Sequence, residues 1–208
     1  MAAPKPWKDR AQRVLYTSSP DRGLDIVLEL WPDVLAAVPD ALLGFAYPSV
    51  YDAVADQDAH VAQHRDKIAA LSDQSGVTKL GPLSQPALAA LMCDSRVWVH
   101  PSWMTMYNAP FHETSCIGAM EAQAAGCFVV ASDWGALSET VQWGLRVNGD
   151  APGPRWREGL VAGIVQGLTD EESGDTAVYQ GPRRVKHLGW DGVGEQIGKL
   201  IAGRDSPR

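Results

Sequence analysis

Two glutamates, Glu113 and Glu121, stand eight positions apart in the segment FHETSCIGAMEAQAAG. The segment is otherwise apolar and rich in small residues, and it leads into CFVVAS, a run typical of a buried strand. A buried carboxylate needs a hydrogen-bonding partner to offset the loss of water, and the hydroxyls of a sugar are such partners. The pair therefore has two interpretations: a sugar-binding pair, or a helix that happens to carry a solvated glutamate.

The same segment predicts a helix with Thr114 or Ser115 as its N-cap and Gly126 just past its end. Small residues along this helix indicate that it packs closely on a sheet. Its first turn would present free backbone N–H groups, and the positive end of the helix dipole, to a phosphate. Glu113 would lie in the loop at this helix start, with Glu121 about two turns further along.

A second candidate is the loop SSPDRG, which follows the first expected strand. Arg22 would lie at the carboxyl end of that strand, on the same edge of the sheet as Glu113. An arginine there can hold a diphosphate through bidentate, charge-assisted hydrogen bonds, and Ser18 and Ser19 could add hydroxyl or backbone donors. The alternative is a surface arginine in a turn whose serines serve only the backbone.

Runs of apolar residues alternate with helical patterns along the chain, which predicts a doubly wound, Rossmann-like α/β domain with a parallel sheet. Ligands of such sheets bind beyond the carboxyl ends of the strands. We expect one domain over residues 11–202, with loose ends at 1–10 and 203–208. The expected strands are 12–17, 42–47, 77–83, 96–102, 127–132 and 144–150, and the expected helices are 24–38, 52–72, 85–93 and about 115–125, followed by three helical stretches from Arg155 onward.

Composition narrows the classes of partner. A net charge of −7 over 208 residues argues against a nucleic-acid binder, although a local pocket can still hold a small anion. Cys93, Cys116 and Cys127 are odd in number and lack metal-type spacing, so we expect small buried thiols in a reducing, cytoplasmic compartment. No stretch has the roughly 18 apolar residues that a membrane-spanning helix needs, and the N-terminus does not read as a secretory signal.

Four blocks of the sequence together resemble a known family. They are RVLYTSSPDRGLDIVLELWP, GPLSQPALAALMCDSRVWVHPSW, HETSCIGAMEAQAAGCFVVASDWGALSETV and GWDGVGEQIGKL. In this order, from about Arg13 to Ile201, they resemble the C-terminal, donor-binding half of GT-B glycosyltransferases of the GT4 type.

The resemblance implies a role for each matching position. Glu113 would contact the transferred sugar and Glu121 the ribose of a nucleotide-diphosphate sugar, while Arg22 would hold the diphosphate. The remaining donor-binding positions that it implies are Ser18 and Ser19, the base-binding loop at Leu83 and Ser84, and the backbone amides of Cys116 and Ile117.

The implied function is that of a retaining glycosyltransferase that uses a UDP- or GDP-sugar, with front-face attack and neither a protein nucleophile nor a metal. Ser18–Ser19 replace the Gly-Arg of many members, and the loop at 104–112 looks longer than usual. The chain has no room for the acceptor-binding half, so we expect a separate acceptor-binding subunit or self-association, or else a fragment. The alternative is a non-catalytic nucleotide-sugar-binding or assembly subunit.

Three further signals carry less weight. Asp56-Gln57-Asp58 has the form of a metal-binding DxD, but it lies in a polar, helical stretch rather than after a strand, so we expect a solvated face and no metal. Gly192 and Gly194 lack the preceding strand of a dinucleotide fingerprint. His112 could donate to the sugar or diphosphate, or could be structural.

Overall fold

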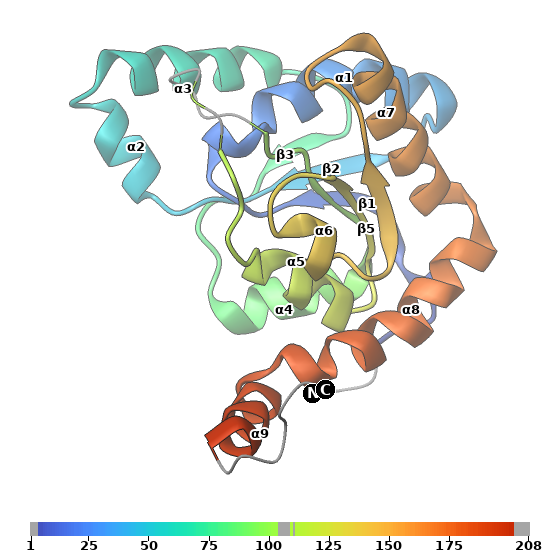
Figure 1. The fold of residues 1–208 in the computed structure, drawn as a ribbon. Coiled ribbons are helices and arrows are strands. Elements are labelled where there is room, and N and C mark those ends of the chain that lie inside the picture. Colours follow the sequence, from blue (N-terminus) through green and yellow to red (C-terminus); the bar gives the residue numbers. More distant parts are fainter. Residues whose placement is uncertain (1–3, 104–108, 110, 202–208) are drawn as a thin grey trace.

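Six parallel strands form the sheet around which the chain folds (Figure 1). The computed structural model describes residues 4–103, 109 and 111–201. The strands lie in the order β3-β2-β1-β4-β5-β6, and every neighbouring pair is parallel. This confirms the expected doubly wound α/β class. The strand bounds are β1 Ala11–Tyr16, β2 Leu42–Phe45, β3 Val77–Lys79, β4 Ser95–His100, β5 Phe128–Ser132 and β6 Gly144–Val147.

Alternate residues of the central strands enter two separate cores, one on each face of the sheet. Val14 and Val97 belong to the core that also contains Trp31 of α1. Leu15 and Trp98, their neighbours along β1 and β4, belong to the other core. Side chains of a strand point to opposite faces in turn, so a strand buried on both faces must be apolar throughout. The uninterrupted apolar runs in the sequence reflect this requirement.

Helices cover both faces of the sheet, with α1 and α7 on one side and α4, α5 and α6 on the other (Figure 1). All the expected helical stretches are present, and the short helices α2 and α6 were not expected as separate elements. The helix bounds are α1 Leu24–Ala37, α2 Val50–Ala55, α3 Ala59–Leu71, α4 Gln85–Asp94, α5 Ile117–Ala124, α6 Leu137–Thr140, α7 Pro154–Thr169, α8 Glu171–Val185 and α9 Trp190–Ile201.

The single helix expected over residues 52–72 is in fact two helices, α2 and α3, separated by the DxD sequence. The Asp58 side chain accepts hydrogen bonds from the backbone amides of His60 and Val61 and so acts as the N-cap of α3. Asp56 pairs with Arg65 at 2.9 Å. These aspartates therefore have structural contacts, and the expectation that the DxD sequence holds no metal stays a prediction.

The N-terminal segment is not loose over residues 7–10. Trp7 is buried, and its indole N–H donates to the Gly167 carbonyl oxygen at 3.1 Å. The guanidinium of Arg10, also buried, donates to the carbonyl oxygens of Ser95 and Ala125 at 3.1 and 2.8 Å. An arginine with several carbonyl partners can be buried because its donors are satisfied. The expected loose tail at 203–208 lies outside the described residues.

The expectation of small buried cysteines holds for Cys127, whereas Cys93 and Cys116 are only partly buried. All three are free thiols.

None of the helices in the described part of the chain combines the length and apolar character needed to cross a bilayer.

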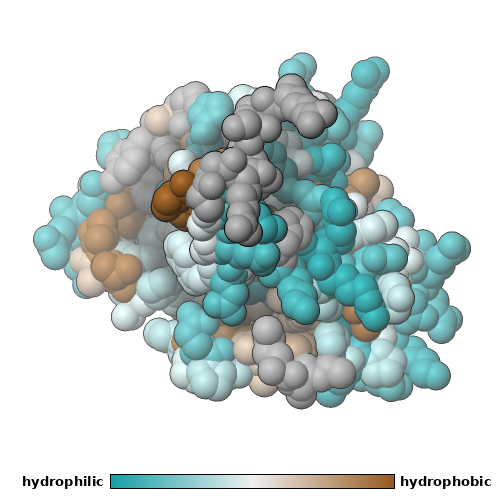
Figure 2. All heavy atoms as spheres, turned by 60° about the horizontal axis from the view of Figure 1, so that its bottom comes forward, coloured by the Kyte–Doolittle hydropathy of each residue, from teal (hydrophilic) through white to brown (hydrophobic). Residues whose placement is uncertain are grey.

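Helix α9 lies apart from the sheet, beyond the end of α8 (Figure 1). None of its residues is buried, and it exposes the apolar side chains of Trp190, Ile197, Leu200 and Ile201. Figure 2, which brings the bottom of Figure 1 forward, shows a mainly hydrophilic face with hydrophobic colour in small, separate areas.

Candidate functional site

The candidate site lies where the strand order of the sheet reverses. β1 and β4 are neighbours in the sheet. After β1 the chain continues to β2 on one side of this pair, and after β4 it continues to β5 on the other side. Ligands of doubly wound sheets bind at such a point. Gly23, after β1, lies against Pro101, after β4: a Cβ added at Gly23 would come within 2.9 Å of the Pro101 carbonyl oxygen. The loops that carry Arg22 and Glu113 therefore meet at this edge, which we call the carboxyl edge.

Glu113 is held at the carboxyl edge by a buried histidine. Its Oε1 lies 2.9 Å from Nε2 of His100, the last residue of β4. The His100 side chain is 1% exposed and that of Glu113 is 14% exposed. The imidazole stacks on Trp98, with ring centroids 5.3 Å apart, and the Trp98 indole donates to Thr17 Oγ1 at 2.9 Å. A chain of contacts from β1 through β4 thus fixes the carboxylate.

Helix α5 begins at Ile117, not directly after Thr114 or Ser115 as expected. Its N-cap is Cys116, which adopts the left-handed conformation with φ 47° and makes no side-chain capping bond. That conformation is uncommon for a residue other than glycine and marks a sharp turn of the backbone. Among the described residues, no acceptor is hydrogen-bonded to the backbone amides of Cys116 and Ile117. These two amides are available to an anion.

Small residues bring α5 close to the sheet, as expected. Ala119 and Ala122 are fully buried, and a Cβ added at Gly118 would lie 3.1 Å from the ring of Trp98. Gly126, with φ 78°, follows the helix and supplies the expected left-handed C-terminal stop. Ile117 is 64% exposed, so the start of the helix points away from the core.

Arg22 reaches the carboxyl edge from the short helix Pro20–Arg22 that follows β1. Its Nη1 donates to Asp21 Oδ2 at 2.9 Å, and its guanidinium carbon lies 3.3 Å from the centre of the Phe111 ring. Ser19 contacts Asp21 through its hydroxyl, and its carbonyl oxygen accepts a bond from the Tyr16 hydroxyl at 2.6 Å. Arg22 is thus half-buried and paired within its own loop. Ser18, also half-buried, belongs to the same loop.

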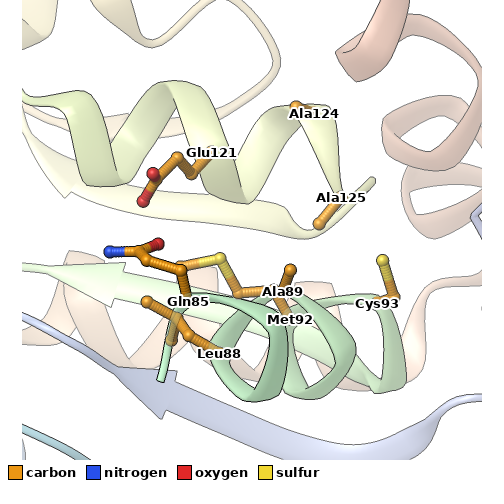
Figure 3. Close-up of a pocket in the computed structure, with 8 residues that line it drawn as sticks. All are labelled: Gln85, Leu88, Ala89, Met92, Cys93, Glu121, Ala124 and Ala125. Atoms are coloured by element: carbon orange, nitrogen blue, oxygen red, sulfur yellow. The ribbon is translucent and has the colours of Figure 1, made fainter. Parts of the chain in front are cut away.

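Glu121 is exposed, and the expectation of a buried carboxylate is wrong for it. It lines a groove between α4 and α5 with a volume of about 200 Å³, and its carboxylate points toward Gln85 at the start of α4 (Figure 3). Ser84 is the N-cap of α4 and accepts a bond from the Ala87 amide at 3.4 Å. Ser84, with Leu83 before it, therefore lies at the end of α4 that Glu121 faces.

The predicted residues thus fall into two neighbouring groups. Arg22 and Glu113 lie at the carboxyl edge with Ser18, Ser19, Cys116 and Ile117. Glu121 belongs to the groove between α4 and α5, whose lining does not include Arg22 or Glu113. The start of α5 connects the two groups, because Cys116 and Glu121 are about one and a half turns apart on one helix.

His100, Glu113 and Cys116 could be read as a metal site, because their ligand atoms lie within 4.8 Å of one another. Burial, together with the Glu113 charge, raises the pKa of the Cys116 thiol to about 12. Metal binding to this thiol would have to expel its proton, as it does wherever a thiol ligates a metal. The expectation of metal-independent function stays a prediction.

Sequence reasoning missed two parts of this site. His100 was treated only as part of a strand, although its place directly before Pro101 marks it as a strand end. Trp134 and Gly135, after β5, pack on the Glu113 segment: the Ala136 amide donates to the Glu113 carbonyl oxygen at 2.8 Å. No local sequence pattern connects residues 113 and 135, so this contact could not be predicted from the sequence. The loop at 104–112 lies largely outside the described residues.

The fold is a doubly wound α/β domain whose carboxyl edge carries a basic and an acidic side chain, Arg22 and Glu113. Residues 11–170 match the family described as "Glycosyl transferases group 1", and the chain belongs to this family. The resemblance to the C-terminal half of GT-B glycosyltransferases is confirmed. No curated protein matches the chain.

Several solved structures share the fold. Sucrose-phosphate synthase from Thermosynechococcus elongatus is 24% identical with a TM-score of 0.67, over 96% of this chain and 46% of that one. A mutant of S. aureus TarM, in complex with Fondaparinux, alpha-GlcNAc-glycerol and UDP, is 14% identical with a TM-score of 0.67, over 99% and 38%. The pneumococcal O-GlcNAc transferase GtfA, in complex with UDP and GlcNAc, is 13% identical with a TM-score of 0.62, over 95% and 38%. This chain spans less than half of each.

Proposed function

We propose that this chain is the donor-binding domain of a retaining, GT4-like glycosyltransferase, which binds a UDP- or GDP-sugar for transfer to an acceptor. One observation carries the proposal: a basic and an acidic side chain, Arg22 and Glu113, converge from two adjacent strands at the reversal point of the sheet. Family membership supports the reaction class. The UDP present in the TarM and GtfA structures supports a nucleotide as ligand.

The diphosphate is proposed to bind between Arg22 and the start of α5. The free amides of Cys116 and Ile117 and the positive end of the helix dipole support this position, because they favour negative charge. Charge that builds on the leaving diphosphate in the transition state would be stabilised by the same groups. Ser18 and Ser19 would add hydrogen bonds from the loop after β1.

The sugar and the nucleoside are proposed to bind on either side of the diphosphate. Glu113 would accept hydrogen bonds from the transferred sugar, and its fixed carboxylate suits that role. Glu121 would hold the ribose hydroxyls in the groove between α4 and α5, with the base against the backbone of Leu83 and Ser84. The position of Glu121 supports this role, because it lines the groove and its carboxylate points toward Gln85 at the start of α4 (Figure 3).

We propose that the acceptor-binding half is supplied in one of three ways: by another chain, by another part of a longer chain, or by a second copy of this chain through self-association. The structural relatives support the need for such a half, since more than half of each lies outside the matched part. The uncovered side chains of Ile197, Leu200 and Ile201 on α9 also support contact with a partner. The proposed reaction uses no metal, and the three free thiols support the proposed cytoplasmic location.

Calorimetry with UDP, GDP and their sugars tests the proposal. Glu121→Ala is expected to weaken UDP binding, whereas Glu158→Ala, which removes an exposed glutamate on α7, serves as a control and leaves it unchanged. Unchanged affinity in Glu121→Ala would remove the role given to that residue. No binding at millimolar concentrations of any of these ligands would contradict the donor-binding function.

A second measurement separates the enzyme from the alternative, a non-catalytic binding or assembly subunit. Slow hydrolysis or transfer of a bound nucleotide sugar supports an enzyme. Tight binding without turnover, with every acceptor tried, supports a binding module.

A further inference from the structure

An exposed aromatic pair stands beside Glu113. Trp134 lies just after β5 in the chain, at the carboxyl edge, and is 41% exposed. Its ring stacks on His112, with centroids 4.9 Å apart and an angle of 28° between the planes. The stack uses one face of the indole, so the exposed area includes surface that a ligand can reach. A large aromatic ring left open to water contributes little to folding and suits stacking on a ligand.

The backbone holds this pair in a fixed place relative to Glu113. The Ala136 amide donates to the Glu113 carbonyl oxygen at 2.8 Å. Gly135, at φ 58°, lies so close to Glu113 that an added Cβ would come within 2.7 Å of the same oxygen. His112 directly precedes Glu113 in the chain. A rigid aromatic surface loses little conformational entropy when it binds a ligand.

The charges around the pair indicate the class of ligand. Glu113 and Asp133 bring two carboxylates to this part of the edge, and Arg146 Nη1 lies 3.8 Å from Asp133 Oδ1. Asp133 Oδ1 is buried without a hydrogen-bond partner among the described residues, so the 21% of this side chain that is exposed lies on its other atoms. Carboxylates disfavour an anionic ligand and accept hydrogen bonds from hydroxyls. A neutral sugar ring offers both an apolar face for the indole and hydroxyls for the carboxylates.

We propose that Trp134 and His112 form a carbohydrate-binding platform that stacks on a neutral pyranose ring of the acceptor, next to the sugar held by Glu113. The assignment to the acceptor rests on the proposed donor-binding function. A nucleobase is the less suitable occupant, since the groove between α4 and α5 that would take the nucleoside is lined by other elements.

The test compares Trp134→Ala and Trp134→Phe with Trp190→Ala, which removes an indole that is 87% exposed on α9. The probes are methyl glycosides of glucose, mannose, galactose and N-acetylglucosamine, whose binding is followed by saturation-transfer NMR and titration. Trp134→Ala is expected to bind the preferred glycoside roughly tenfold more weakly. Trp134→Phe should retain most of the affinity, and Trp190→Ala all of it. Thermal unfolding checks that each variant is folded.

The outcomes separate this platform from the donor site. UDP affinity is measured on the same proteins and is expected to be unchanged in Trp134→Ala. The platform is overturned if the wild-type chain binds UDP but no glycoside, if Trp134→Ala binds glycosides normally, or if Trp190→Ala loses as much affinity. An equal loss of UDP affinity in Trp134→Ala would identify a base-stacking surface instead and also overturn it. Glycoside binding through Trp134 without any nucleotide binding would support the platform and contradict the donor-binding function.

Discussion

Replacement of Gly135 by alanine tests whether the loop after β5 positions Glu113. Gly135 has φ 58°, and an added Cβ would lie 2.7 Å from the Glu113 carbonyl oxygen and 2.8 Å from its amide nitrogen. Both neighbours are backbone atoms, so no flexible side chain can move aside. A non-glycine residue in the left-handed region costs about 1–2 kcal/mol, and forced overpacking adds about 1–3 kcal/mol. Gly135→Ala should therefore destabilise the domain by about 2–5 kcal/mol.

Gly81→Ala is the matched control. Gly81 also has a positive φ, 70°, but an added Cβ would meet nothing within 4 Å. Gly81→Ala should therefore lower the free energy of unfolding only by the cost of the left-handed conformation, about 1–2 kcal/mol. The smaller conformational entropy of the unfolded alanine chain favours folding in both variants and cancels in their difference.

Urea unfolding at neutral pH gives the free energy of unfolding of each variant, provided that the slope with denaturant is unchanged. The contact with Glu113 is measured by the difference between Gly135→Ala and Gly81→Ala. Equal destabilisation of the two variants would refute the claim that this loop presses on the Glu113 backbone.

Three further substitutions test the framework around the site. Gln123→Leu removes a fully buried amide that makes four hydrogen bonds and should lower the free energy of unfolding in urea by about 3 kcal/mol. Arg10→Met leaves three carbonyl oxygens without their partner and should cost about 2–4 kcal/mol in the same assay. Burial raises the pKa of Asp25, but its bonds to His64 and Lys67 outweigh burial and lower it to about 2. The charged form thus stabilises the fold above pH 4 and this stability is lost as the pH falls toward 2, so Asp25→Asn should flatten the acid side of the stability profile.

The apolar runs in the sequence were sufficient to predict the strands of the sheet, for a physical reason. Strands buried on both faces must be apolar throughout, so segments such as CFVVAS could be recognised without any long-range information. Boundaries that depend on a single cap were harder. The break between α2 and α3 depends on Asp58 capping the second helix, and a long polar stretch can equally continue as one helix.

The candidate site could be predicted where helix geometry places its residues, or where the topology of a parallel sheet does so, as for Arg22 and Glu113 at one edge. Glu113 and Glu121 share one helix and its entry loop, so their relation follows from helical geometry, although Glu121 proved to be exposed. The contact of Gly135 with Glu113 joins residues 22 positions apart, and only tertiary packing produces it. The left-handed Cys116 was also unpredictable, because cysteine has no preference for that conformation.

The pairing of Arg22 with Asp21 leads to a last prediction about the diphosphate. Arg22 would have to share its guanidinium between the Asp21 carboxylate, 2.9 Å away, and an incoming diphosphate. The carboxylate therefore competes with the ligand for the same cation. Asp21→Asn keeps an oxygen that can accept from the Ser19 hydroxyl but removes the competing charge.

Since a partly exposed ion pair contributes about 0.2–1 kcal/mol, Asp21→Asn should tighten UDP binding by a small factor, at most about fivefold. Calorimetry with UDP measures this change, and uridine, which lacks phosphate, is the control ligand and should bind equally to both proteins. A gain for both ligands would point to a general rearrangement of the loop. Unchanged or weaker UDP binding by Asp21→Asn would mean that Arg22 does not hold the diphosphate, because a cation released from its ion pair with Asp21 must favour an anion that it contacts.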